Sequence, residues 1–200
     1  MSADLRARLA AAVLGGFAVA VACSAGGSNT AESAYDKLVG AVESRDAGLL
    51  FDALDMETHW CWMTIQRAHR EAYDVVLSNF PEGAERELEL KRFVDGATAE
   101  NPRALFARVL PAATWTTLGA QVGTGGAAGG LRLVGDEQVE ITGRGNAKMT
   151  FRRHRERRWG WGFAGLVDEG KALEKRALAD LEVIRNNAAD HERAAARAAR

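Results

Sequence analysis

The amino-acid sequence predicts an α+β fold, with amino-terminal helices packed on a curved antiparallel sheet and a long helix at the carboxyl end. This fold is predicted by changes in the spacing of apolar residues along the chain. These residues recur at helical spacing over residues 31–110, alternate with period two after Pro111, and return to helical spacing from Asp168 onward. Strands with one apolar face need a cover, and the amino-terminal helices are available to provide it.

The first three helices have clear boundary signals. Residues 29–32 place a capping residue three positions before Glu32, which predicts a helix start. Asp46 is expected to cap a short second helix, and the third helix should span residues 57–77. Four side chains of the second helix are expected to face inward: Leu49, Leu50, Ala53 and Leu54.

Proline and glycine divide the next segment. The Pro-Glu-Gly sequence at residues 81–83 should end the third helix, and shorter helices are expected over residues 86–94 and 103–110. The second of these starts after Pro102 and is stopped by Pro111, because proline is tolerated at the start of a helix and disrupts its interior.

The period-two pattern predicts four strands, the first three of which lie between residues 114 and 155. Residues 114–122 are interpreted as a strand with Trp115 and Thr117 on one face. Residues 138–142 and 147–155 flank a Gly-Arg-Gly-Asn turn, which predicts a β-hairpin.

The last predicted strand covers residues 159–166 and carries an aromatic face. Its alternation places three side chains on the same side: Trp159, Trp161 and Phe163. We expect these side chains to be buried against Trp62 and Ile65 of the third helix.

Residues 119–130, GAQVGTGGAAGG, loosely resemble a dinucleotide-binding loop. In such a loop the glycines open a helix whose amino terminus meets the phosphate. Here a strand-like segment follows the glycines instead, so the sequence predicts a surface loop.

The final helix carries a narrow apolar stripe of five residues: Leu173, Ala177, Leu181, Ile184 and Ala188. The stripe is narrower than the apolar face of a helix buried in a core, which suits docking along a groove. We therefore expect residues 168–188 to pack on the domain and residues 190–200 to be loosely held.

The amino terminus has the pattern of an export signal. Arg6 and Arg8 precede an uncharged run at residues 9–21, which is shorter than the roughly 20 apolar residues that a membrane span needs. The segment Ala20-Val21-Ala22-Cys23 resembles the lipobox of bacterial lipoproteins. That resemblance implies cleavage after residue 22, lipidation of Cys23 with palmitate or another acyl chain, and a flexible tether at residues 23–30.

Three locations follow from this segment. The preferred one is a lipoprotein facing the periplasm, with the outer membrane favoured because Ser24 stands where some inner-membrane lipoproteins have aspartate. The alternatives are ordinary secretion with Cys23 left free, and an uncleaved membrane anchor. If Cys23 is lipidated, Cys61 has no partner cysteine, and its position between two tryptophans predicts burial as a small apolar residue.

The charge is nearly balanced, with 26 basic and 27 acidic side chains. This excludes a global basic footprint for nucleic acid. Five arginines cluster beside Trp159 and Trp161: Arg152, Arg153, Arg155, Arg157 and Arg158. They are interpreted as a solvated edge, with a lipid headgroup, a glycan or an acidic protein face as the possible anionic partner, and nucleic acid is not expected.

The order of elements resembles the NTF2-like superfamily over residues 31–166. A helix, a break of the Asp46 type, a short helix with Leu49 and Leu54, and later hairpins ending in a tryptophan-containing strand carry the resemblance. It implies a curved antiparallel sheet wrapped around helices, which together form a cone with an internal pocket. Residues 167–200 form an additional charged helix.

The candidate chemistry lies on the third helix. NTF2-like enzymes place an acidic, histidine or tyrosine side chain inside the pocket, and four residues could do so here: Asp55, His59, His69 and Tyr73. A histidine at such a position is more often structural, and a ligand contact is the next interpretation. The four histidines lack metal-ligand spacing, so neither a metal nor another cofactor is expected.

The preferred function is a lipid-anchored binding or scaffold module of the cell envelope, with an envelope protein or an anionic ligand as partner. One alternative is a small-molecule enzyme that uses the four candidates in an NTF2-like pocket. The other is an interaction protein that works through its carboxyl-terminal helix.

Overall fold

The computed structural model describes residues 28–122, 130–154 and 160–200. Within them the chain forms an α+β structure with seven α-helices and a four-stranded antiparallel sheet. The helices are α1 (Ala31–Ser44), α2 (Ala47–Ala53), α3 (Met56–Asn79), α4 (Ala84–Thr98), α5 (Pro102–Val109), α6 (Ala112–Gln121) and α7 (Val167–Ala198). The strands are β1 (Leu131–Gly135), β2 (Gln138–Thr142), β3 (Lys148–His154) and β4 (Gly160–Phe163). Cys23, Trp159 and three of the five clustered arginines lie outside the described residues.

Side-chain caps fix the starts of α1 and α2. The cap of α2 is Asp46, as predicted, whereas the cap of α1 is Thr30 and not the residue three positions before Glu32. Thr30 accepts a hydrogen bond from the Ser33 amide, and Asp46 accepts from the amides of Gly48 and Leu49. Each bond satisfies a backbone donor that has no partner within its own helix. Of the four α2 residues expected to face inward, Leu49 was assigned wrongly, since 46 % of its surface is exposed. It lies in the first turn, on the solvent side of a helix that is only seven residues long.

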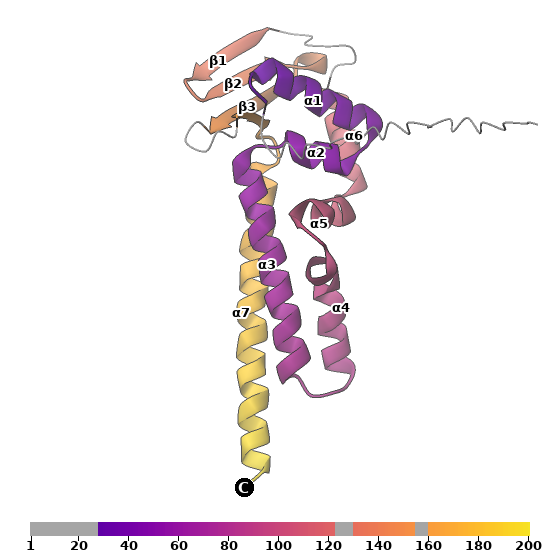
Figure 1. Cartoon of the computed structure of the whole chain (residues 1–200), viewed down its shortest axis with the longest axis vertical. Helices are drawn as coiled ribbons and strands as arrows, with labels where there is room; N and C mark the ends of the chain where they lie inside the picture. The colour runs from indigo at the N-terminus through magenta and orange to yellow at the C-terminus, as the bar shows by residue number, and fades with distance from the viewer. Residues whose placement is uncertain (1–27, 123–129, 155–159) are drawn as a thin grey trace, which may run out of the picture.

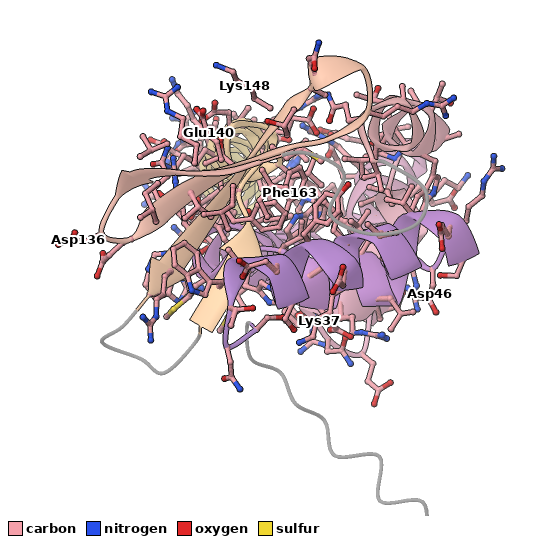
Figure 2. All side chains as sticks on the ribbon, turned by 90° about the horizontal axis from the view of Figure 1, so that it is seen from above. Lys37, Asp46, Asp136, Glu140, Lys148 and Phe163 are labelled. Atoms are coloured by element: carbon pink, nitrogen blue, oxygen red, sulfur yellow. The ribbon has the colours of Figure 1, made fainter. Side chains whose placement is uncertain are left out.

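The sheet has the order β1-β2-β3-β4, and every neighbouring pair is antiparallel. The predicted hairpin is confirmed, with Gly145 and Asn146 of its turn both at φ +63°. Directly paired residues such as Val139 and Phe151 share one face of the sheet, and Phe163 continues that face onto β4. Figure 2 shows Phe163 in the interior, between the sheet and α1.

The segment 114–122 is helix α6 and not the predicted strand. Three threonines favoured a strand by propensity, but the inward side chains follow a helical spacing. Leu118 and Val122 are buried and Trp115 is half-buried, at intervals of three and four residues. Packing against the rest of the core therefore outweighs the local preference of the threonines.

The sheet's aromatic face is covered mainly by α1. Tyr35 of α1 meets Phe151 edge to face at 6.2 Å, and Phe151 meets Phe163 at 5.6 Å. Trp62 packs instead against Phe106 of α5, so the expected α3 cover is wrong for that residue. Trp161 packs against the core but is only half-buried.

Figure 1 shows a head and a stalk. The head consists of the sheet with α1, α2 and α6, and the stalk consists of α3, α4 and α7. Helices α3 and α7 both leave the head in the same direction, while α4 returns towards it. Small buried side chains occur on both α3 and α7, including Ala68 and Ala72 on α3 and Ala177 and Ala188 on α7.

Helix α7 follows α3 down to the end of the stalk. His191 packs on Phe80, and the Asn79 amide donates to Glu192 at 2.8 Å. From Glu192 to the last residue every side chain is exposed, although the backbone stays helical to Ala198. Leu173 of the expected stripe is 44 % exposed, whereas the stripe from Ala177 to Ala188 is buried. Across the described parts of the chain, no helix combines the length and apolar character needed to cross a bilayer.

Candidate ligand-binding cleft

The four predicted site residues all belong to α3, but they do not share one site. Asp55 is the amino-terminal cap, and His69 lies fourteen residues further along the helix. At 1.5 Å of rise per residue, these two positions are about 20 Å apart along the axis. Asp55 and His69 therefore cannot act on the same bound molecule as an acid–base pair.

Asp55 has a structural role at the junction of α2, α3 and β4. Its Oδ1 accepts hydrogen bonds from the Thr58 amide at 2.9 Å and the Thr58 hydroxyl at 2.8 Å. Its own amide donates to the Phe163 carbonyl at 3.0 Å. The residue is fully buried, and this desolvation raises the pKa of its carboxyl.

His59 is a core residue. Its ring lies 4.1 Å from the ring of Phe51, and it hydrogen-bonds with the backbone of Phe51 and Leu54. Burial lowers the pKa of His59 to about 4, so the imidazole is neutral at physiological pH. The alternative that the sequence allowed, a structural histidine, fits this position.

His69 lies at the floor of a cleft of about 240 Å³ between α3, α4, α5 and α7, which we call the His69 cleft. Ile65 and Trp62 of α3 extend the floor, one turn and two turns before His69, respectively. Leu105 and Val109 of α5 form one wall. Tyr73, one turn beyond His69, is half-buried against the core and does not line the cleft.

The opposite wall of the His69 cleft comes from α7, and α4 closes its lower end. Leu173 and Ala177 supply apolar surface, and Arg176 and Asp180 supply charge. On α4, Arg92 forms an ion pair with Asp180, and its guanidinium lies 5.2 Å above the ring of Phe93. Arg176 forms no ion pair with any described residue, so one cationic side chain at the cleft is left without a protein counter-ion.

The imidazole of His69 is packed against α4, but one of its ring nitrogens has no hydrogen-bond partner among the described residues. Its ring meets Phe93 edge to face at 5.6 Å, and its Nδ1 is buried without a hydrogen-bond partner among the described residues. A Cβ on Gly96 would lie 2.4 Å from the His69 Cβ, so α4 can pack here only because residue 96 is glycine. Burial lowers the pKa of His69, which favours the neutral ring.

Part of the arginine patch takes part in an internal ion-pair cluster. Arg152 pairs with Glu57 of α3 at 2.8 Å, and Lys171 of α7 pairs with the same carboxylate at 2.5 Å. The hydrogen bond from Lys171 is the largest cause of the lowered pKa of Glu57. Arg153, the next residue of β3, is half-buried and lies on the opposite face of the strand from Arg152. Arg152 therefore ties the sheet to the stalk. The anionic-partner interpretation stays a prediction for Arg153 and for Arg155, Arg157 and Arg158, which lie outside the described residues.

Cys61 is buried at the α3–α7 seam, as predicted. Only 3 % of its surface is exposed, and burial raises the pKa of its thiol to about 12. A thiol with so high a pKa supplies almost no nucleophilic thiolate at neutral pH. Gly170 of α7 packs directly against it.

The cleft residues outside α3 were not found from the sequence. Arg92, Arg176 and Asp180 lie in charged helices whose other arginines and aspartates look the same. Only the packing of α4 and α7 around His69 distinguishes them, and their sequence spacing carries no signal of that packing.

No group of three or more histidine, cysteine or acidic side chains suitable for a metal ion occurs in residues 28–122, 130–154 and 160–200. Comparison of the chain with protein-family models, with curated proteins and with solved structures gives no match. The site must therefore be interpreted from its own geometry.

Proposed function

We propose that this chain is a lipid-anchored binding module of the cell envelope, which holds a small amphiphilic anion in the His69 cleft. The observation that carries the binding function is the cleft itself, with apolar walls and an unpaired arginine. Clefts that bind small molecules combine mostly apolar walls with a few polar groups that orient the ligand.

Each part of the proposed ligand has a counterpart in the cleft. An acyl or similar chain fits between Ile65 on the floor and Leu105 and Val109 on the wall. Its anionic group fits Arg176, whose guanidinium prefers planar carboxylate or phosphate oxygens. His69 contributes its ring to the lining of the same cleft, where the ligand would lie against it.

A binding role is favoured over catalysis because the candidate acid–base groups do not converge. Asp55 is engaged as the cap of α3, and His59 packs on Phe51. The cleft itself contributes one histidine, His69, and one aspartate, Asp180, which forms an ion pair with Arg92. Acid–base chemistry would need two such groups within reach of one bound molecule.

The anchor and the fold family are part of the same proposal. The lipobox-like segment ending at Cys23 supports export and lipidation. The order of α1, α2 and the later hairpins, with α1 against the aromatic face, supports an NTF2-like origin for the head. The long α7 would then be an addition to that fold.

The anchor is tested by growing cells that express the full chain in labelled palmitate. The wild type should carry the label and Cys23→Ala should not. Label that persists in the Cys23→Ala protein would contradict lipidation at this residue.

The ligand is tested by calorimetric titration of the mature chain with decanoate, and with decyltrimethylammonium as a probe of equal chain length and opposite charge. We expect saturable one-to-one binding of decanoate, at least tenfold tighter than that of the cation. Arg176→Gln should weaken decanoate binding about fivefold, or about 1 kcal/mol. Arg185→Gln, at an exposed ion pair with Glu71 further down α7, is the matched control and should have no effect.

Equal binding of the two probes, or no saturable binding of either, would overturn the proposed ligand class. Val109→Trp separates cleft binding from binding elsewhere, because residue 109 is 39 % exposed at the wall and a larger ring there fills the cleft. It should abolish decanoate binding, whereas Val183→Trp on the exposed side of α7 should retain it.

A further inference from the structure

A second cavity, of about 580 Å³, lies in the head between α6, β3, β4 and the start of α7. We call it the Thr150 cavity. None of its lining residues belongs to the His69 cleft. It therefore presents a separate surface, whose chemistry differs from that of the cleft.

The floor of the Thr150 cavity is apolar and firmly packed. It includes Leu118, Met149 and Phe163, each no more than 2 % exposed. Gly143 fixes the distance between α6 and the hairpin, because a Cβ there would lie 2.2 Å from the Gln121 carbonyl oxygen and 2.4 Å from the Met149 methyl carbon. The cavity is thus bounded by elements that cannot close on it without rearranging the core.

The wall is polar, and its side chains make no hydrogen bonds with other described residues. Three threonines and a glutamine line it: Thr114, Thr117, Gln121 and Thr150. None of their side chains donates or accepts a hydrogen bond with another described residue. These hydroxyl and amide groups can therefore hydrogen-bond with a ligand, since no other described residue forms hydrogen bonds with them.

Opposite charges stand at the edge of this cavity. Lys148, at the start of β3, lies at the periphery in Figure 2, and Glu169 lies in the first turn of α7. Both line the cavity, and within the described chain neither forms an ion pair with the other or with a third residue. This differs from the neighbouring Glu57, whose charge is matched by Arg152 and Lys171.

We propose that the Thr150 cavity binds a zwitterion of the amino-acid or dipeptide class with an apolar side chain. Its carboxylate would meet Lys148, its ammonium group would meet Glu169, and its side chain would rest near Leu118 and Met149. A simple anion would leave Glu169 repelling it, and a simple cation would leave Lys148 repelling it. A neutral sugar would use neither charge and would find no exposed aromatic ring in the wall, because Phe163 is sealed in the floor.

The proposal is tested by nuclear magnetic resonance titration of the mature chain with L-leucine and with L-leucyl-L-leucine. At least one of them should shift the backbone signals of Thr117, Thr150 and Gly165 saturably. N-acetyl-L-leucine, which lacks the ammonium group, and L-leucinamide, which lacks the carboxylate, should each bind at least tenfold more weakly than the better zwitterion.

Two variants test which charged group of the ligand Glu169 and Lys148 each bind. Glu169→Gln should remove the preference for the zwitterion over its N-acetyl form, and Lys148→Gln should remove the preference over the amide. The control variants Glu182→Gln and Lys175→Gln, at exposed positions of α7, should change neither ratio. Val109→Trp should leave zwitterion binding intact, which distinguishes this site from the His69 cleft.

Absence of saturable shifts with both zwitterions would overturn the proposal. Equal binding of leucine and its two blocked forms would do the same, because the charges would then play no part. Neither result would affect decanoate binding at the His69 cleft.

Discussion

Asp55 shows how one buried side chain can stabilise and destabilise the same fold. Its Oδ1 caps α3 through two bonds to Thr58, while its Oδ2 has no partner among the described residues. The cap contributes stability, but the desolvated carboxyl costs free energy when it ionises. The pKa is raised, so the folded state holds this proton more tightly than the unfolded state, and the cost grows as pH rises above the unfolded value.

We therefore expect the two simplest substitutions at residue 55 to act in opposite directions. Asp55→Asn keeps an oxygen that can accept from Thr58 and removes the titrating group, so the free energy of unfolding at pH 7 should stay the same or rise. Asp55→Ala removes the cap and should lower it by about 1–2 kcal/mol. Urea denaturation measures both. A large loss in Asp55→Asn would show that the ionised carboxylate itself stabilises the fold.

His59 should make the protein sensitive to mild acid. Burial lowers its pKa from 6.5 to about 4, so between these values the unfolded state binds the proton and the folded state does not. Stability present above pH 6.5 is thus lost as the pH falls to about 4, by about 3 kcal/mol for this residue. His69 contributes with the same sign.

The pH profile of the free energy of unfolding tests this for His59. Between pH 7 and 4 the wild type should lose more stability than His59→Gln, whose remaining slope comes from His69 and the carboxylates. Parallel profiles for the two proteins would mean that the imidazole of His59 titrates normally.

At the scale of elements, α3 depends on a glycine in the helix that packs against it. Gly96→Ala puts a Cβ into the His69 side chain, so the unfolding free energy should fall by about 1–3 kcal/mol. Gly40→Ala is the matched control, because no atom lies within 4 Å of a Cβ there and α1 gains helix propensity. It should stabilise by about 0.5–1 kcal/mol. Similar effects of the two substitutions on thermal unfolding would contradict the packing of α4 on His69.

The aromatic face of β4 gives a second comparison between neighbouring positions. Phe163 is 2 % exposed, and its truncation to alanine should cost about 3–5 kcal/mol. Trp161 is half-buried, so Trp161→Ala should cost clearly less, although the sequence pattern alone predicted a largely buried ring. Chemical denaturation ranks the two, and the reverse order would mean that the sheet is covered at Trp161.

The sequence predicts elements well where the signal is local. Asp46 marks the start of α2 through bonds made within three residues, and the hairpin turn needs only four residues. Helix α6 was missed because threonine propensity and helical spacing disagree over one short segment. What decided the conformation there was packing of Leu118 and Val122 against residues distant in sequence.

At the scale of the whole molecule, the arrangement of elements could not be predicted. Periodicity indicates that α3 and α7 each have an apolar stripe, but it does not say that the stripes meet side by side and run in the same direction. The His69 cleft exists only because of that arrangement. The α3 candidates included His69, which lines the cleft, while Arg92 and Arg176 of the same cleft gave no sign in the sequence.

The central claim is that the His69 cleft is a binding site for an amphiphilic anion, and the ring of His69 reports on it directly. Nitrogen resonances of the His69 side chain, assigned with a His69→Gln variant, should shift saturably when decanoate is added to the mature chain. The shift should follow the binding curve from calorimetry and disappear in Val109→Trp. Unchanged His69 ring resonances at saturating decanoate would contradict the claim, because a ligand in this cleft must lie against that ring.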